Sequence, residues 1–378
     1  MHRREFLKTG GAAALGLAVG GCASRSAPQA APSAGGPLRR VNLVPVDCSM
    51  DRITRTTVGL RPFRPTGWLV KPERFGAKTV IHNYGHGEAG MSMAWGTGAL
   101  AADLALPDLE RRAGVIGCGV IGLTAARQLQ RRGFDVTIYA MAVPPHTTSN
   151  MSKADFGPWM PRANLLTPQW VSQFRRAQKI AYDELQLLVG PRYGVSWIDH
   201  YNLLDVAPTE SELRRIHPEP LPDDNIASVL LEPGEHPFAS KYATRRPELS
   251  MEPTVYLDAL SRDVITFGGR IVIRKFDALR DLMALPESLI VNCTGLGARA
   301  LFGDESLQPS WGQLTVLVPQ PEVTYSVASM MPRSDGIVLG GGPAPNTWSL
   351  AVNEEAQRQV VERHAAIFRA MRAPRGKM

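Results

Sequence analysis

The stretch AGVIGCGVIGLTAARQLQRRGFDVTIY, residues 113–139, decides the fold of this chain. Its first four residues, Ala113–Ile116, form a short apolar run typical of a buried strand, and Val136–Tyr139 forms a second one. Between them, apolar residues recur at helical spacing over 120–129, and Gly133 marks the end of that helix. A strand, a glycine-rich turn, a helix and a second strand in this order predict a βαβ unit within an α/β fold.

The turn between the first strand and the helix carries the pattern G-x-G-x-x-G at Gly117, Gly119 and Gly122. Gly117 permits a tight turn, Gly119 lets a pyrophosphate approach the backbone, and Gly122 lets the helix pack closely on the strand. The helix start at Val120 and Ile121 adds unpaired N–H donors and the positive end of the helix dipole. The pattern predicts a dinucleotide site. The alternative is a glycine-rich turn that binds no ligand.

The end of the second strand departs from the usual dinucleotide pattern. An acidic side chain that binds a ribose is expected there, but the sequence reads Tyr139-Ala140-Met141-Ala142. Contacts to a ribose must therefore come from other residues.

Composition excludes several classes of protein. With 378 residues, 44% of them hydrophobic and 20% charged, the chain is long and apolar enough for a large globular core. The net charge of +7 is spread over the chain without a basic run, so we expect no nucleic-acid partner. The four cysteines show no C-x-x-C spacing, so we expect neither a disulfide framework nor a metal site: Cys22, Cys48, Cys118 and Cys293.

The first 50 residues are expected to lie outside the main fold. Residues 1–22 resemble an export signal, because Arg3-Arg4 is typical of the twin-arginine route and Val19–Cys22 resembles a bacterial lipobox. A plain signal peptide cut near Ala23 is the alternative. Residues 23–50 are expected to be a flexible linker. The prediction is an exported, extracytoplasmic or periplasmic protein whose only membrane attachment is a lipid on Cys22.

Motifs downstream of the glycine turn resemble the D-amino-acid oxidase and D-aspartate oxidase family of FAD enzymes. They are Val136–Ala140, Thr147–Ser149, Val291–Gly295, Gly312-Gln313 and Gly340-Gly341. Two further blocks, Gly59–Pro65 and His82–Gly90, resemble motifs that close the family's chain, yet they lie near the start of this one. The resemblance covers about residues 55–370 and implies that the family order is circularly permuted.

The resemblance implies an α/β fold, with a Rossmann-like FAD-binding domain and an interleaved antiparallel-sheet substrate domain. The FAD-binding domain is expected at 51–160 and 277–300, and the substrate-binding domain at 161–276 and 301–352. Residues 353–378 are expected to form a C-terminal helix and tail. Because the motif order is permuted, residues 51–112 should fold back beside the Gly117 turn.

The resemblance also implies which residues contact FAD. The hydroxyls and N–H groups of Thr147, Thr148 and Ser149 would bind the pyrophosphate, and Gly295 lies in another FAD-binding motif. A helix beginning near Gly90 would direct its dipole at the flavin ring. Its first turn and the residues before it are the candidates Gly87, Glu88, Ala89, Gly90, Met91 and Ser92. Glu88 stands where glycine is usual, so a positive φ would strain it and we expect its side chain to point outward.

On the substrate side, the resemblance implies that Arg61 grips the α-carboxylate with its planar guanidinium. Tyr325 matches one active-site tyrosine of the family, while Ser329 replaces a second and is too short to substitute for it directly. Arg64 and Arg333 are further candidates for an acidic substrate side chain, and each is also compatible with a surface charge.

The expected function is a FAD-dependent oxidase that converts D-amino acids with O₂ into 2-oxo acids, ammonia and H₂O₂. His82 and His86 are expected to be structural, because hydride transfer from a neutral amine needs no protein base. The alternative is a non-catalytic lipoprotein that binds flavin or an amino acid, to which Ser329, Glu88 and Met141 point. An NAD dehydrogenase would fit the glycine turn but would leave the blocks at 59–65 and 85–90 unexplained.

Overall fold

A computed structural model describes residues 41–158, 161, 163–209, 212–213, 228–341, 344–345 and 347–372. The predicted export signal and Cys22 lie outside these residues. The compact unit considered below comprises residues 40–378. Among the residues described, no helix has the length and apolar character needed to cross a membrane.

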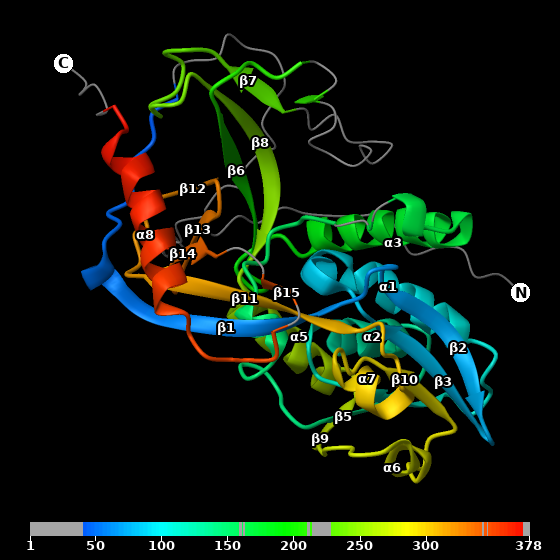
Figure 1. Ribbon diagram of the computed structural model, residues 1–378. Helices are drawn as coiled ribbons and strands as arrows, with labels where there is room; N and C mark the ends of the chain where they lie inside the picture. The colour runs from blue at the N-terminus through cyan, green and yellow to red at the C-terminus, as the bar shows by residue number, and fades with distance from the viewer. Residues whose placement is uncertain are drawn as a thin grey trace, which may run out of the picture. The chain divides into compact units, whose positions relative to one another are not determined.

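The predicted βαβ unit lies within a six-stranded sheet, called sheet B below (Figure 1). Its strands, in spatial order, are β2 (Leu69–Phe75), β3 (Lys78–Tyr84), β10 (Leu289–Asn292), β4 (Arg112–Ile116), β5 (Asp135–Ala140) and β9 (Arg270–Ile273). All neighbouring pairs are parallel except β2 with β3. The helix between β4 and β5 is α2 (Val120–Gln130), which confirms the element order expected for 113–139.

Helices cover both faces of sheet B. Those that share the largest apolar cluster are α1 (Gly90–Ala105), α2, α3 (Pro168–Leu187) and α5 (Pro253–Thr266). Glycines allow α1 to approach its neighbours closely, because a Cβ at Gly96 would lie 1.9 Å from the Ala177 oxygen. Leu282 of α6 (Leu279–Met283) lies in the opposite cluster, and Phe302 of α7 (Gly297–Phe302) packs against it.

The second sheet, sheet A, has nine strands among the residues described and is largely antiparallel. In spatial order these are β1 (Ile53–Phe63), β11 (Gln308–Leu317), β14 (Gly336–Gly340), β13 (Met330–Arg333), β12 (Tyr325–Val327), β6 (Val195–Leu204), β8 (Tyr242–Met251) and β7 (Val229–Leu231), with β15 (Ala344–Pro345) beside β11. The terminal helix expected over 353–370 is α8 (Glu354–Arg369), and Asn353 caps it by accepting from the Ala356 N–H at 2.9 Å. In Figure 1, α8 lies along one face of sheet A, and its apolar side chains share a cluster with that face.

Short 3₁₀ helices connect these elements. They are η1 (Met50–Arg52), η2 (Gly87–Ala89), η3 (Thr148–Met151) and η4 (Ala163–Leu165).

The segment from residue 41 to residue 50 differs from the flexible linker expected over 23–50. Val46 is buried, and Val41, Leu43 and Cys48 pack against the cluster beneath α8. The Asp47 N–H also donates to Gln320 Oε1 at 2.9 Å. The apolar side chains of this segment therefore bury against sheet A, which a freely moving linker would not do.

The expected return of 51–112 beside the glycine turn is confirmed. β3 pairs with β10, which pairs with β4, and the Thr124 hydroxyl of α2 donates to the Ala94 carbonyl of α1. The domain boundaries differ in detail. β1, expected in the FAD-binding domain, pairs with β11 in sheet A, and α5 and β9, expected in the substrate domain, pack with sheet B. The boundaries differ because these elements pair with strands from distant parts of the chain, and that pairing is not visible in the local sequence.

Candidate active site

Three parallel strands of sheet B end at one edge, and the predicted cofactor loops follow them. The loop after β4 begins at Gly117, the loop after β10 contains Cys293 and Gly295, and the turn after β3 contains Gly87. Gly117 has φ +111°, and a Cβ there would lie 2.5 Å from the Cys293 carbonyl oxygen. The loops after β4 and β10 therefore touch, and only glycine fits at their contact.

Gly122 has the packing role expected of it, while Gly119 lies against a side chain of the turn after β5. A Cβ at Gly122 would lie 1.9 Å from the Gly117 carbonyl oxygen, so any larger residue would push α2 away from β4. A Cβ at Gly119 would lie 3.0 Å from Ser149 Oγ, and the same oxygen accepts from the Val120 N–H at 3.0 Å. Ser149 thus joins the turn after β5 to the start of α2.

The turn after β5 supplies further polar groups. Thr147 precedes η3 and donates from Oγ1 to Asn150 Oδ1 at 2.8 Å, while Thr148 is exposed. Asn150 Nδ2 is a buried donor with no partner among the residues described. A glycine-rich turn at a helix start, with an orphaned donor beside it, fits the pyrophosphate of a dinucleotide. At the end of β5, Met141 is 72% exposed, and its side chain cannot replace the missing ribose-binding carboxylate.

The segment Gly87–Ser92 forms η2 and the first turn of α1, as expected of a helix that begins near Gly90. Gly87 has φ +57°, whereas Glu88 has no positive φ, so the strain considered for Glu88 does not arise. Ala89 and Met91 are buried. The Ser92 hydroxyl accepts from the Gly157 N–H at 2.9 Å and donates to the Asp155 carbonyl at 3.2 Å, so Ser92 anchors a neighbouring loop.

Arg61 lies on β1 and reaches this turn. Its Nη1 donates to Glu88 Oε1 at 2.9 Å, so Glu88 is turned toward Arg61 and does not simply point outward. A Cβ at Gly312 of β11 would lie 2.5 Å from Arg61 Nη2, so the guanidinium lies close against the β11 backbone. Next to it, Pro62 packs beside Gly295, whose φ is +58°. The structure thus brings Arg61, Glu88 and Gly295 together.

Tyr325 and Ser329 lie elsewhere, which corrects the substrate contacts expected of them. The Tyr325 ring is buried in the cluster beneath α8, and its hydroxyl donates to the Val44 carbonyl at 2.8 Å. Ser329 Oγ donates to the Gly340 carbonyl at 2.9 Å and lies 3.2 Å from Nε2 of His364 on α8. Successive residues of a strand face opposite sides of a sheet, and Tyr325 faces the α8 side.

The remaining candidates are held in ion pairs or structural contacts. Arg64 pairs with Asp304 at 3.0 Å, and Arg333 pairs with Asp335 at 2.9 Å. His86 is buried against Thr97 at 2.9 Å, and burial lowers the pKa of its imidazole to about 3. His82 lies between Asn292 and Glu73.

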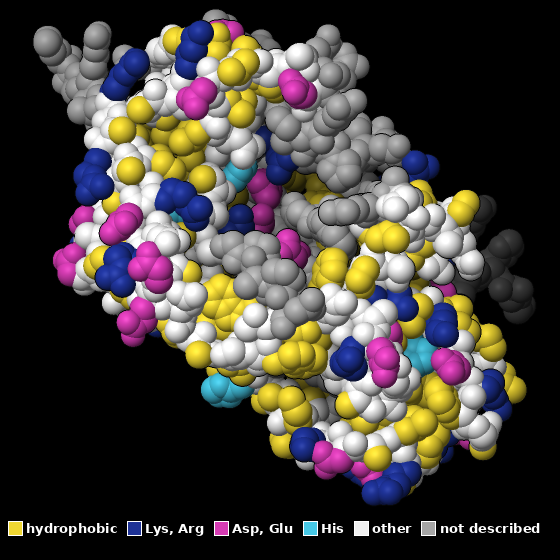
Figure 2. All heavy atoms as spheres, viewed as in Figure 1, with side chains coloured by type: hydrophobic (Ala, Val, Ile, Leu, Met, Phe, Trp, Pro, Cys, Tyr) yellow, Lys and Arg dark blue, Asp and Glu magenta, His cyan; other side chains and the backbone are white. Residues whose placement is uncertain are grey.

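Five buried or half-buried ionisable residues, which we did not predict from the sequence, lie close together and are called the charged cluster below. Lys153 pairs with Asp155 at 3.0 Å, Arg246 pairs with Glu248 at 3.2 Å, and His200 Nδ1 lies 3.9 Å from Glu248. Burial, and then the charge of Asp155, raises the pKa of Glu248 to about 7. Burial, and then the charge of Lys153, lowers the pKa of His200 to about 4. Figure 2 shows acidic, basic and histidine side chains gathered around a hollow in the molecular surface.

Two contacts link the charged cluster to the cofactor edge. Ser92 at the start of α1 holds the Asp155 carbonyl, and the Phe156 N–H donates to the Leu249 carbonyl of β8 at 2.8 Å. The available sequence signal was the alternation of Arg246 and Glu248 within β8, because charged residues two apart on a strand share one face.

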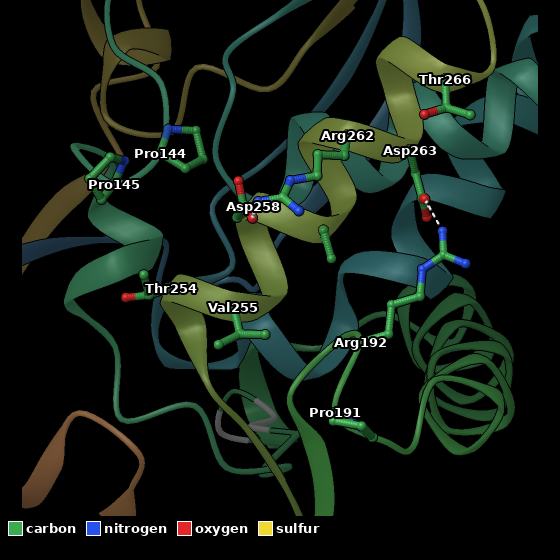
Figure 3. A pocket seen from close by; sticks show the side chains of 11 residues that line it. Pro144, Pro145, Pro191, Arg192, Thr254, Val255, Asp258, Arg262, Asp263 and Thr266 are labelled. Atoms are coloured by element: carbon green, nitrogen blue, oxygen red, sulfur yellow. Dashed lines mark hydrogen bonds and ion pairs between the residues drawn. The ribbon is translucent and has the colours of Figure 1, made fainter. Parts of the chain in front are cut away.

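A separate cleft of about 670 Å³ lies between Pro144-Pro145 and α5. Figure 3 shows the Arg192 guanidinium directed at Asp263, with which it pairs at 2.7 Å. No predicted cofactor or substrate residue lines this cleft. Its shape therefore gives no support to the predicted site.

Comparison with known proteins supports a flavoenzyme fold. Residues 112–376 match the DAO family model, described as FAD dependent oxidoreductase. A D-amino-acid oxidase of Rubrobacter xylanophilus is 29% identical over 70% of this chain and 79% of that protein. One from Dictyostelium discoideum is 26% identical over 67% and 72%. Glycine oxidases from Bacillus cereus and Geobacillus kaustophilus have similar structures, each with TM-score 0.51, at 15% and 17% identity. The first match covers 68% of this chain and 78% of that one, and the second covers 70% and 80%.

Proposed function

Because this chain belongs to the DAO family of FAD-dependent oxidoreductases, with FAD as its cofactor, we propose that it is a D-amino-acid oxidase. It would convert a D-amino acid, O₂ and water into a 2-oxo acid, ammonia and H₂O₂. The observation that carries this proposal is the position of Arg61 beside the start of α1, on the edge where the glycine turn also lies. The similarity to D-amino-acid oxidases supports the same substrate class.

The residues that would hold FAD come from three loops of that edge. Gly117–Gly122 and Ser149 would hold the pyrophosphate, with Asn150 Nδ2 as an additional donor. The first turn of α1 offers the positive end of a helix dipole, which stabilises negative charge. When bound, FAD accepts a hydride from the substrate Cα and passes the electrons to O₂.

Arg61 would orient the substrate. A guanidinium binds a carboxylate through two parallel hydrogen bonds, which sets both position and rotation. The absence of a side chain at Gly312 leaves room for the guanidinium against the backbone of β11. Positioning of this kind contributes directly to the rate, because the reacting C–H must be aligned with its acceptor.

We also propose that the motif order arose by circular permutation. The family match begins at residue 112, whereas β1, β2, β3 and α1 precede that residue and still pack within the same two sheets. The ends of compact domains often lie close together, so joining them and opening another loop can preserve packing.

Export by the twin-arginine route and a lipid on Cys22 remain part of the proposal. They rest on Arg3-Arg4 and on Val19–Cys22. Metabolic labelling with a radioactive fatty acid would detect the lipid, and Cys22→Ala should abolish the label while leaving the soluble activity.

The proposed activity is tested on the purified, FAD-loaded protein. Peroxide release is measured with neutral, basic and acidic D-amino acids, their L-enantiomers, glycine and sarcosine. Arg61→Ala should retain its flavin absorbance but lose at least a hundredfold in kcat/KM, since several kcal/mol of carboxylate binding disappear. Turnover of L-enantiomers alone would replace the proposed substrate class.

A non-catalytic flavin-binding protein is the second candidate. It is favoured by the position of Tyr325 and Ser329, which leaves Arg61 as the only one of the three expected substrate residues found at the cofactor edge. A protein that carries FAD, releases no peroxide and shows no anaerobic reduction of its flavin by any compound of the panel would establish this alternative.

A further inference from the structure

The Arg61–Glu88 ion pair leaves hydrogen-bonding atoms unused on both side chains. Arg61 Nη1 donates to Glu88 Oε1 at 2.9 Å, and within the described part of the chain neither side chain makes another hydrogen bond. A guanidinium has five N–H donors and a carboxylate has two acceptor oxygens. The Nε–Nη2 edge of Arg61 and Oε2 of Glu88 can therefore each take a further partner while the ion pair stays intact.

The backbone on both sides holds this pair in place. Arg61 lies in the ladder between β1 and β11, opposite Ser310, and its guanidinium lies close to Gly312. Glu88 lies in the short turn between Gly87 and the start of α1. The side chains are 28% and 46% exposed, so a small molecule in solution can reach them.

A cation and an anion side by side complement a ligand that carries both charges on one carbon. We propose that Arg61 and Glu88 together bind the zwitterionic head of an α-amino acid as it enters the site, before its ammonium loses a proton, with its carboxylate on the free edge of Arg61 and its ammonium on Glu88. This inference rests on the proposed function and adds Glu88 as a residue that determines substrate class. A ligand with a carboxylate alone would bring its charge close to Glu88, and that repulsion weakens binding.

Glu88 is the distinctive half of this site. Without Glu88, Arg61 would accept any small carboxylate, including 2-hydroxy acids, because a guanidinium hydrogen-bonds only to the two carboxylate oxygens. With Glu88 in place, selection requires a positive charge beside the carboxylate. Discrimination then comes from an attractive contact for amino acids and a repulsive one for plain acids.

The test uses three ligands that share one shape. 2-Aminoisobutyrate is a zwitterion that lacks a Cα hydrogen and so cannot be oxidised, pivalate replaces its ammonium by a methyl group, and tert-butylammonium replaces its carboxylate. Calorimetric titration of the FAD-loaded protein should give the tightest binding for 2-aminoisobutyrate. Glu88→Gln should weaken that binding at least tenfold and strengthen pivalate binding severalfold.

Glu73→Gln is the matched control, because Glu73 is also an ion-paired glutamate with a 45% exposed side chain, and it lies on β2 beside His82. It should leave all three affinities unchanged. Arg61→Ala should weaken both ligands that carry a carboxylate. Unchanged or tighter binding of 2-aminoisobutyrate by Glu88→Gln would overturn the inference, whether or not the wild type oxidises D-amino acids. If 2-aminoisobutyrate binds as expected but no D-amino acid is oxidised, the proposed function fails and the Arg61–Glu88 site stands.

Discussion

The carboxyl edge of sheet B and the charged cluster beside sheet A differ in the source of their polar groups. The edge presents backbone groups, and the cluster presents side chains. At the edge of sheet B, close contacts at Gly117 and Gly122 leave the backbone bare. In the charged cluster, Arg246, Glu248 and His200 bring buried charge together from β6 and β8. A backbone site depends on the absence of side chains, and a side-chain site depends on which strands become neighbours.

This difference affects what a substitution should do in each region. At the sheet B edge, any added atom collides with backbone, which cannot move without separating α2 from β4. In the charged cluster, removal of a charge alters the protonation of its neighbours but leaves the shape of the sheet intact.

The largest effect is expected at Gly122. Gly122→Val places a Cβ 1.9 Å from the Gly117 carbonyl oxygen, so the βαβ turn must open. We expect a loss of stability above about 3 kcal/mol, comparable to severe overpacking, and loss of bound FAD. Flavin absorbance measures the bound FAD, and thermal unfolding measures the loss of stability. Gly157→Ala, where no atom of the described residues lies within 4 Å of the added Cβ, should retain FAD. Full retention of FAD by the valine variant would contradict the role of this contact.

Glu248 should produce the next largest effect, and that effect should depend on pH. Its pKa is raised to about 7, so the folded protein binds more protons than the unfolded chain between about pH 4.5 and 7, and stability falls as pH rises through that range. Glu248→Gln removes this dependence. Relative to wild type, the variant should gain about 1–3 kcal/mol between pH 4 and pH 8.

Urea unfolding at both pH values measures the gain. Because His200 titrates in the opposite sense, the comparison must be made between variant and wild type rather than within one profile. Glu362→Gln on the exposed side of α8 is the control and should follow the wild-type profile. A constant difference between the Glu248 variant and wild type would show that Glu248 does not titrate in this range.

Ser149 tests the link between the two loops at the sheet B edge. Ser149→Ala removes the acceptor of the Val120 N–H, so it should cost about 1 kcal/mol, as the loss of a helix cap does. It should also make FAD easier to remove by dialysis. His146→Ala, at an exposed residue of the same loop with no predicted cofactor contact, should change neither property. Equal FAD retention by all three proteins would place the pyrophosphate away from this turn.

Tyr325 should give the smallest effect. Tyr325→Phe removes a hydrogen bond to the Val44 carbonyl, but Val44 is 41% exposed, so water can replace the hydroxyl. A stability loss of about 0.5 kcal/mol and an unchanged KM are expected. An increase in KM of tenfold or more would place Tyr325 at the substrate after all and would contradict a purely structural role in the cluster beneath α8.

Local features of the sequence were sufficient to predict the βαβ unit and much of the cofactor edge. Residues 113–139 predicted β4, α2 and β5 because strand and helix periodicity act over a few neighbouring residues. The roles of Gly117 and Gly122 followed for the same reason, since their contacts lie within one turn or in the adjacent strand. The return of 51–112 was predictable from motif order alone.

Only the tertiary structure decided which side chains meet. Glu88 and Arg61 are 27 residues apart and meet because β1 crosses to sheet A beside the start of α1. The charged cluster required the loop around Asp155 to cover β8, and Tyr325 turned to the α8 side because apolar partners there were available for its ring. By itself, the sequence determined the backbone site, because glycine and periodicity act locally. The side-chain sites depend on which strands are neighbours and on which side of the sheet each side chain faces. Both are decided by the burial of the whole core.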